Sequence, residues 1–120
     1  MRDFRKLTAW QKAHALAVAV HRVAHQENFR SAPGLRAQLL RAVDSVPANI
    51  AEGAGKTSEA EFGRFLDIAL GSGREVDNHV MLAVALGCID DRAGAIVLLD
   101  VDEVKRILYS LSRAVRRRMQ

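Results

Sequence analysis

Residues 35–58 read LRAQLLRAVDSVPANIAEGAGKTS and show one continuous helical pattern followed by a break. Their apolar side chains recur at spacings of three and four residues, which places them on one face of an α-helix. This stripe comprises Leu35, Leu39, Val43, Val46 and Ile50. Gly53 and Gly55 are expected to end the helix, because glycine readily adopts the left-handed conformation found at helix C-termini. The segment therefore predicts one buried helical face and a short connection.

Pro47 is the residue of this stretch that conflicts with a helix. A proline in a helix interior removes a backbone hydrogen bond and clashes with the preceding turn, at a cost of about 3 kcal/mol. Small residues surround it, and Gly-Ser-Gly at 71–73 likewise interrupts the next predicted helix. Because small residues let another backbone approach closely, we expect tight packing here, within the bundle or between subunits. Asn49 and Ser45 are expected to satisfy carbonyl groups that the proline releases.

Helices are also predicted on both sides of this segment. Towards the N-terminus, a first helix covers about residues 7–27, and Pro33 fits the first turn of the second helix. Towards the C-terminus, Ser58 and Glu61 form a capping-box pattern that begins a third helix. This third helix is expected to end at Gly87.

The start of the last helix depends on the short apolar run AGAIVLL, residues 93–99, which periodicity alone cannot assign. Its candidate first residues are Asp90, Asp91 and Asp100. No strand-like alternation is present in the sequence, and long helices with short connections favour antiparallel neighbours. We therefore predict that residues 1–120 form a single all-α domain, an antiparallel up-and-down four-helix bundle.

The composition excludes several classes of protein. Hydrophobic residues make up 49% and charged residues 27% of the sequence, a globular balance rather than a disordered one. The single cysteine, Cys88, cannot form an internal disulfide, which favours a reducing compartment. No segment approaches the roughly 18 apolar residues of a membrane span. We expect a cytoplasmic protein that does not contact a membrane.

No catalytic constellation is evident in the sequence. Cys88 has no histidine near it, and free cysteine usually behaves as a small buried hydrophobe. The run GAGKT, residues 53–57, is similar to the end of a phosphate-binding loop but lacks the upstream glycine and the preceding strand. We therefore expect no enzyme activity, no catalytic residue and no cofactor.

Three histidines lie near one face of the first predicted helix, and metal binding is the most enzyme-like alternative. His21 and His25 have the i, i+4 spacing that can share a metal ion, and His14 lies seven residues before His21. However, HRVAH lacks the glutamate of the HExxH motif, and no carboxylate pair accompanies it. We expect solvated histidines and no metal site, with a metal binder using His21 and His25 as the remaining alternative.

Positive charge suggests an anionic partner. The formal net charge is +4 and the pI is about 9.8, and such groups neutralise phosphates without regard to sequence. Solvated faces with i, i+4 ion pairs are the alternative, and composition alone does not decide between the two. The candidate phosphate-binding residues are Arg41, Lys56, Arg64, Arg74, Arg113, Arg116, Arg117 and Arg118.

The central string, residues 35–77, resembles the signature of bacterial four-helix-bundle proteins encoded within intervening sequences of large-subunit (23S) ribosomal RNA genes. The family pattern is Q-[apolar]-x-R-A-x-x-S-[IV]-P-x-N-I-A-E-G followed by R-F-L-x-I-A-x-G-S. The first part is matched at Gln38, Arg41, Ala42, Ser45, Val46, Pro47, Asn49, Ile50, Ala51, Glu52 and Gly53. The second is matched at Arg64, Phe65, Leu66, Ile68, Ala69, Gly71 and Ser72. The opening LTAWQKAHALA, residues 7–17, is also similar.

This resemblance implies a bundle that assembles into a ring-like homopentamer without known catalytic activity. A related group comprises the accessory proteins of diversity-generating retroelements, basic pentamers that bind nucleic acid and a reverse transcriptase. The motif residues that we associate with packing and with oligomer contacts are Ser45, Pro47, Asn49, Glu52, Gly53, Gly71 and Ser72.

Charge and resemblance together predict a non-enzymatic, basic homo-oligomer, expected to be a pentamer, that binds RNA or DNA through phosphate contacts. The alternative is a protein-interaction module, an accessory subunit for a nucleic-acid enzyme such as a reverse transcriptase. That alternative requires a polypeptide partner whose binding survives moderate salt.

Overall fold

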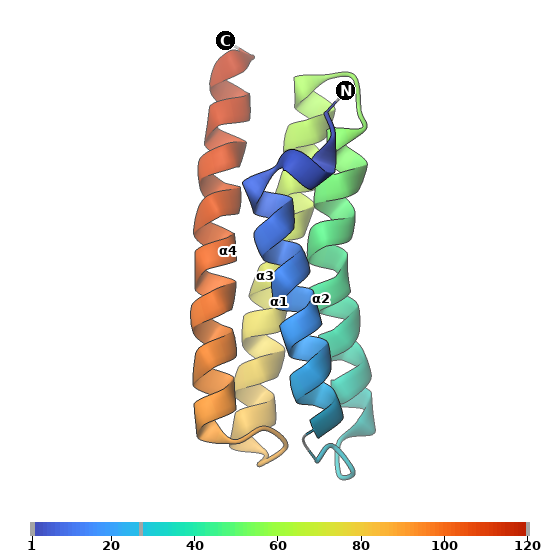
Figure 1. Cartoon of the computed structure of the whole chain (residues 1–120), viewed down its shortest axis with the longest axis vertical. Helices are drawn as coiled ribbons and strands as arrows, with labels where there is room; N and C mark the ends of the chain where they lie inside the picture. The colour runs from blue at the N-terminus through green and yellow to red at the C-terminus, as the bar shows by residue number, and fades with distance from the viewer. Residues whose placement is uncertain (1, 27, 120) are drawn as a thin grey trace.

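The computed structural model of this chain describes residues 2–26 and 28–119. They form a short 3-10 helix, η1 (Phe4–Lys6), and four α-helices: α1 (Thr8–Gln26), α2 (Pro33–Ala54), α3 (Glu59–Ala85) and α4 (Asp91–Arg118). Neighbouring helices run in opposite directions, so both termini and the α2–α3 connection lie at one end of the bundle (Figure 1). The bundle is 48 Å long, and α1 and α3 each pack against both α2 and α4. The predicted all-α antiparallel four-helix bundle is confirmed.

The apolar stripe of α2 lies in the core of the bundle. Leu39, Val43, Val46 and Ile50 are fully buried and belong to one apolar cluster that includes side chains from all four α-helices. Burial of each such side chain stabilises the fold by about 1.5–3 kcal/mol. Leu35, at the start of the helix, is only half-buried.

Side-chain caps set the starts of α3 and α4. The Ser58 hydroxyl accepts a hydrogen bond of 3.1 Å from the Glu61 backbone N–H, as the capping-box pattern predicts. The Asp90 carboxylate accepts one of 2.7 Å from the Ala93 N–H. Residues 93–99 are therefore helical, and Asp100 lies inside α4. Gly87, with φ of 77°, supplies the left-handed residue of the α3–α4 connection.

The C-terminus of α2 differs from the prediction. The helix extends to Ala54, and Gly55 caps it in the right-handed conformation, with φ of −81°. A left-handed glycine is therefore not what ends the helix. Gly53 instead allows α2 and α3 to approach each other, because an added Cβ atom would lie 2.7 Å from the Phe65 Cβ atom.

The helix α2 continues through Pro47 without interruption. The Asn49 side-chain N–H group donates hydrogen bonds of 2.8 Å to both the carbonyl and the hydroxyl oxygen of Ser45. The Ser45 hydroxyl in turn lies 2.8 Å from the Ser72 hydroxyl in α3. We expected Asn49 and Ser45 to bond a carbonyl group that Pro47 leaves without a donor. That group is the carbonyl of Val43, four residues before the proline, whereas Asn49 bonds the carbonyl of Ser45. Asn49 and Ser45 thus bond within α2, and Ser45 also bonds across to α3.

The Gly-Ser-Gly segment of α3 packs unevenly. A Cβ atom on Gly73 would lie 3.1 Å from the Lys105 Cγ atom, so this glycine makes room for the lysine stem on α4. Ser72 is buried. Gly71, in contrast, has no atom within 4 Å of an added Cβ. Close packing within the bundle explains Gly73 but does not explain Gly71.

Candidate nucleic-acid interface

The N-terminal segment is attached to the end of the bundle where α2 passes into α3. The Arg2 backbone N–H donates a hydrogen bond of 2.9 Å to the Ala54 carbonyl oxygen. The Arg2 guanidinium forms an ion pair with Glu59 and lies 4.3 Å from the centre of the Phe62 ring. The Asp3 carboxylate caps η1 by accepting a hydrogen bond from the Arg5 N–H at 3.1 Å. These contacts hold the N-terminal segment at this end of the bundle, where Arg2 shares Glu59 with Arg118 of α4.

Positive charge is concentrated at this end. Residues 2–7, 52–67 and 113–118, which we name the basic end, contain nine Lys and Arg residues against five Asp and Glu residues. Their excess of four equals the net charge of +4 of the complete chain, so the remaining charges balance. The sequence alone suggested a cluster only in its C-terminal arginines. The fold brings that cluster together with two other chain segments at one end of the bundle.

Several cations of the basic end are held by acidic partners. Glu59 pairs with Arg2 and, at 3.5 Å, with Arg118, while Arg116 pairs with Asp67. The hydrogen bond from the Arg2 guanidinium holds the pKa of Glu59 below its usual value of 4.5. The Lys56 ammonium group lies 3.5 Å from the Glu52 carboxylate. These pairs fix the orientation of the arginine side chains and reduce the charge that they offer to a ligand.

A similar pair lies in the N-terminal segment itself. The Arg5 guanidinium donates a hydrogen bond of 3.0 Å to the Asp3 carboxylate. This bond lowers the pKa of Asp3 and raises the pKa of Arg5. Both side chains thus remain charged across the physiological pH range.

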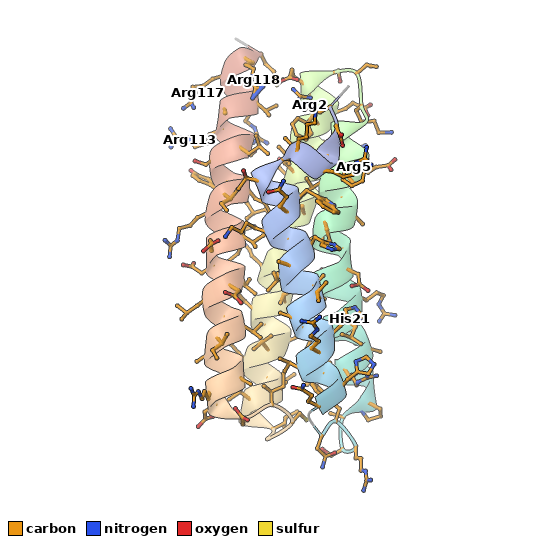
Figure 2. All side chains as sticks on the ribbon, in the orientation of Figure 1. Arg2, Arg5, His21, Arg113, Arg117 and Arg118 are labelled. Carbon is orange, nitrogen blue, oxygen red and sulfur yellow. The ribbon has the colours of Figure 1, made fainter. Side chains whose placement is uncertain are left out.

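Four exposed cations of the basic end form no ion pair within residues 2–26 and 28–119: Lys6, Arg64, Arg113 and Arg117. The Arg64 guanidinium lies 4.7 Å from the centre of the Phe65 ring, and that of Arg113 lies 5.9 Å from the Tyr109 ring. Figure 2 shows Arg113 and Arg117 pointing away from α4, with Arg2 and Arg5 across the same end. These unpaired groups are the ones best able to contact phosphates.

The structure divides the predicted phosphate-binding residues into two sets. Lys56, Arg64, Arg113 and residues 116–118 belong to the basic end. Arg41 lies thirteen residues before the end of α2, and Arg74 lies fifteen residues after the start of α3. At 1.5 Å per residue, each is about 20 Å from the terminus of its helix at the basic end. Arg41 lines a groove between α2 and α3, and Arg74 lines one between α3 and α4.

Arg2, Arg5 and Lys6 were missed by the sequence-based prediction. The segment RDFRK does contain three cations, but no local pattern indicates which part of the fold it contacts. The hydrogen bond to Ala54 and the ion pair with Glu59 place it at the basic end.

The histidines of α1 do not converge. The His21 Nε2 atom lies 2.7 Å from an Asp44 carboxylate oxygen, and the His25 Nδ1 atom lies 2.7 Å from the His21 carbonyl oxygen. The two rings stack with their centres 6.4 Å apart. Within the part of the chain that the structure describes, no group of three or more His, Cys, Asp or Glu residues is placed to hold a metal ion. His14, His21 and His25 instead border a largely apolar groove between α1 and α2.

None of the helices in the described residues is long and apolar enough to cross a membrane. The Cys88 side chain is buried and 1% exposed.

Residues 5–110 match the family model described as 23S rRNA-intervening sequence protein. The chain belongs to this family. Its fold is similar to that of a protein with unknown function from the S23 ribosomal protein family of Bacteroides thetaiotaomicron VPI-5482, with a TM-score of 0.79 and 23% sequence identity. The match covers 88% of this chain and 98% of that chain, and at this identity it concerns the fold alone. No match was found among curated proteins.

The motif residues of this family member lie on different surfaces. Ser45, Asn49 and Ser72 form the hydrogen-bonded connection between α2 and α3. Glu52 pairs with Lys56 at the basic end. Pro47 borders the groove between α1 and α2. The motif therefore does not mark a single surface.

Proposed function

We propose that this protein is a non-enzymatic, basic helical bundle of the cytoplasm that binds RNA or DNA through phosphate contacts. The observation that supports this proposal is the basic end, which carries the complete positive excess of the chain at one end of the bundle. A concentrated positive field attracts polyanions, and each phosphate that it neutralises releases counterions. Lys6, Arg64, Arg113 and Arg117, which have no acidic partner among the described residues, are expected to dominate the contacts.

We also propose that the bundle assembles into a homo-oligomer. The family resemblance implies that this oligomer is a pentamer. Large apolar side chains are exposed near the end of the bundle opposite the basic end. Their exposed fractions range from 45% to 71%: Leu82 45%, Ile96 54%, Leu86 55%, Met81 60% and Leu99 71%. We name these five residues the apolar surface. Contact with another chain would remove this area from water, and several copies together would multiply the positive field.

A salt series tests the nucleic-acid proposal. Binding of structured RNA and of duplex DNA would be followed by fluorescence anisotropy, with the mass of the protein measured in the same buffers. The logarithm of the affinity is expected to fall steeply and linearly with the logarithm of the salt concentration. Absence of binding at low salt would overturn the proposal.

A pair of charge-matched variants tests the location of the site. The variant R64Q/R113Q/R117Q removes three unpaired arginines of the basic end, and R22Q/R30Q/R92Q removes three exposed arginines elsewhere. Both lose the same net charge. The salt slope is expected to decrease by about one for each lost phosphate contact in the first variant only. Equal losses in both variants would indicate that total charge, rather than the basic end, determines binding.

The second candidate function is that of an accessory module that binds a protein. The five exposed residues of the apolar surface favour it, since large apolar side chains left in water become buried when a partner binds. Binding through this surface is expected to survive moderate salt, in contrast to phosphate contacts. Substitution of Leu86 and Leu99 by glutamine is expected to abolish binding of the protein partner, while each single bundle keeps its basic end.

A further inference from the structure

A second polar site lies between α2 and α3, away from the basic end. It is a groove of about 380 Å³ whose polar residues are spaced by three and four on each helix: Gln38, Arg41, Ser45, Ser72, Glu75 and His79. We name it the polar groove. Because α2 and α3 are antiparallel, the contact between Ser45 and Ser72 determines which residues of the two helices face each other across the groove. Arg41 therefore lies opposite Glu75, and Gln38 lies opposite His79.

The serine pair leaves one hydrogen-bond donor unused. The two hydroxyl oxygens lie 2.8 Å apart, and the Ser45 oxygen also accepts a hydrogen bond from Asn49 at 2.8 Å. Two hydroxyl groups offer two hydrogens, and only one of them lies between the two oxygens. The other forms no further hydrogen bond to an acceptor of the described chain. Since Ser45 and Ser72 both line the polar groove, this O–H group is available to a ligand.

The opposing charges of the polar groove do not meet. Arg41 and Glu75 face each other in register, yet no guanidinium nitrogen lies within 4.0 Å of the carboxylate. Arg41 forms no ion pair with any residue whose position the structure gives, and the Glu75 carboxylate lies 3.8 Å from the His79 Nε2 atom. A ligand placed between the walls can accept hydrogen bonds from the guanidinium and donate them to the carboxylate.

His79 adds a further unsatisfied group. Its side chain is 12% exposed, and its Nδ1 atom is covered and has no hydrogen-bond partner among the described residues. A buried polar atom without a partner is destabilising, and it is uncommon in native structures. The polar groove thus contains several groups that have donors or acceptors without a partner among the described residues: Gln38, Arg41, the serine pair and His79.

We infer that the polar groove binds one nucleobase, with guanine preferred. The Glu75 carboxylate repels phosphate groups, so the polar groove does not suit the backbone of a nucleic acid. Guanine presents its O6 and N7 atoms as acceptors for a guanidinium, and its N1–H and N2 amino groups as donors to a carboxylate. These are the groups that Arg41 and Glu75 require.

This inference rests on the proposed function when the base belongs to a bound strand. Ser45 lies eleven residues from Lys56 along the chain, about 16 Å at the rise of an α-helix. A strand held by phosphate contacts at the basic end can place a nearby base in the polar groove. Phosphate contacts then position the strand, and the base contact supplies sequence preference. A free guanine nucleotide is the other source of the same chemistry.

Single-stranded octamers of uridine, with or without one central guanosine, test the inference. Wild-type protein is expected to bind the guanosine-containing octamer about tenfold more tightly, within the range for a bidentate base contact. The variant E75Q should lose this ratio. Its matched control, D100N, removes the same charge from an exposed residue that forms no ion pair with the described residues, and it should keep the ratio. Thermal unfolding would verify that both variants fold.

The outcomes separate this inference from the proposed function. If wild-type protein binds both octamers equally, the base site is overturned while phosphate binding stands. If neither octamer binds, the salt series with structured RNA and duplex DNA decides the proposed function, and guanosine monophosphate is then titrated by NMR against cytidine monophosphate. Shifts at Arg41, Ser45 and Ser72 with the guanine nucleotide alone would support the polar groove as a site for free nucleotide. The absence of such shifts would overturn it.

Discussion

A Cβ atom added to Gly53 in α2 would lie 2.7 Å from the Cβ atom of Phe65 in α3. The same added atom would lie 3.1 Å from the Phe62 ring and 3.4 Å from the Phe62 carbonyl oxygen. Glycine at this position therefore determines how closely the two helices approach near the basic end. Because the Phe65 Cβ atom is fixed to the backbone, a rotamer change cannot relieve the clash.

Substitution of Gly53 by alanine is accordingly expected to destabilise the protein by about 1–3 kcal/mol, the usual cost of overpacking. Urea denaturation measures this change. The control is Gly34→Ala, where an added Cβ meets no atom within 4 Å. That variant is expected to be neutral or more stable by up to about 1 kcal/mol. Equal stability of wild-type protein and G53A would contradict the predicted close approach.

The hydroxyl pair of Ser45 and Ser72 is expected to couple α2 to α3 energetically. A double-mutant cycle with S45A and S72A should give a coupling free energy of about 1 kcal/mol, the usual value for a hydrogen bond between contacting residues. S45A is expected to be the more destabilising single variant, because Asn49 also donates to the Ser45 hydroxyl. Additive effects of the two substitutions would show that the pair contributes no stability.

The ion pair between Arg2 and Glu59 is expected to make stability depend on pH. The pKa of Glu59 is lowered in the folded protein, first by the hydrogen bond from Arg2. A depressed carboxyl pKa stabilises the fold above the unfolded pKa, and this stabilisation is lost as the pH falls through the folded pKa. Wild-type protein should therefore melt at a higher temperature than E59Q near neutrality, and the difference should disappear in acid.

Glu61→Gln provides the control for this pH dependence, since Glu61 is exposed and forms no ion pair with the described residues. Thermal unfolding of wild-type protein, E59Q and E61Q would be followed from neutral pH to below 4.5, the usual carboxyl pKa. An E59Q difference that persists unchanged in acid would show that packing, and not the ion pair, is responsible.

The apolar surface is expected to hold subunits together. Leu86 and Leu99 are 55% and 71% exposed, so their replacement by glutamine should change the stability of a single bundle by less than about 0.5 kcal/mol. The same substitutions should lower the mass of the particle in solution, measured by light scattering. Val18→Gln, on α1, serves as the control for an exposed apolar residue elsewhere, at 37% exposure. An unchanged mass in L86Q/L99Q would place any subunit contact on another surface.

The local elements of the fold could be predicted from the sequence, because their causes lie within a few residues of each other. The apolar spacing from Leu39 to Ile50 defines the buried face of α2, and the cap at Ser58 begins α3. Periodicity could not decide where α4 starts, since the run at residues 93–99 is too short. The Asp90 cap and the core cluster settle that point, because Val97 packs into the core.

Tertiary structure alone decided which distant residues share a surface. Arg2 and Arg118 stand at opposite ends of the sequence, yet both pair with Glu59. Arg41 is a second example, because nothing in the sequence distinguishes it from the other basic residues. The antiparallel register of α2 and α3 places it opposite Glu75 in the polar groove. Helix formation depends on neighbours three and four residues apart, whereas these groupings depend on how whole helices pack. The sequence by itself therefore determined the helices and their buried faces, and packing determined the sites.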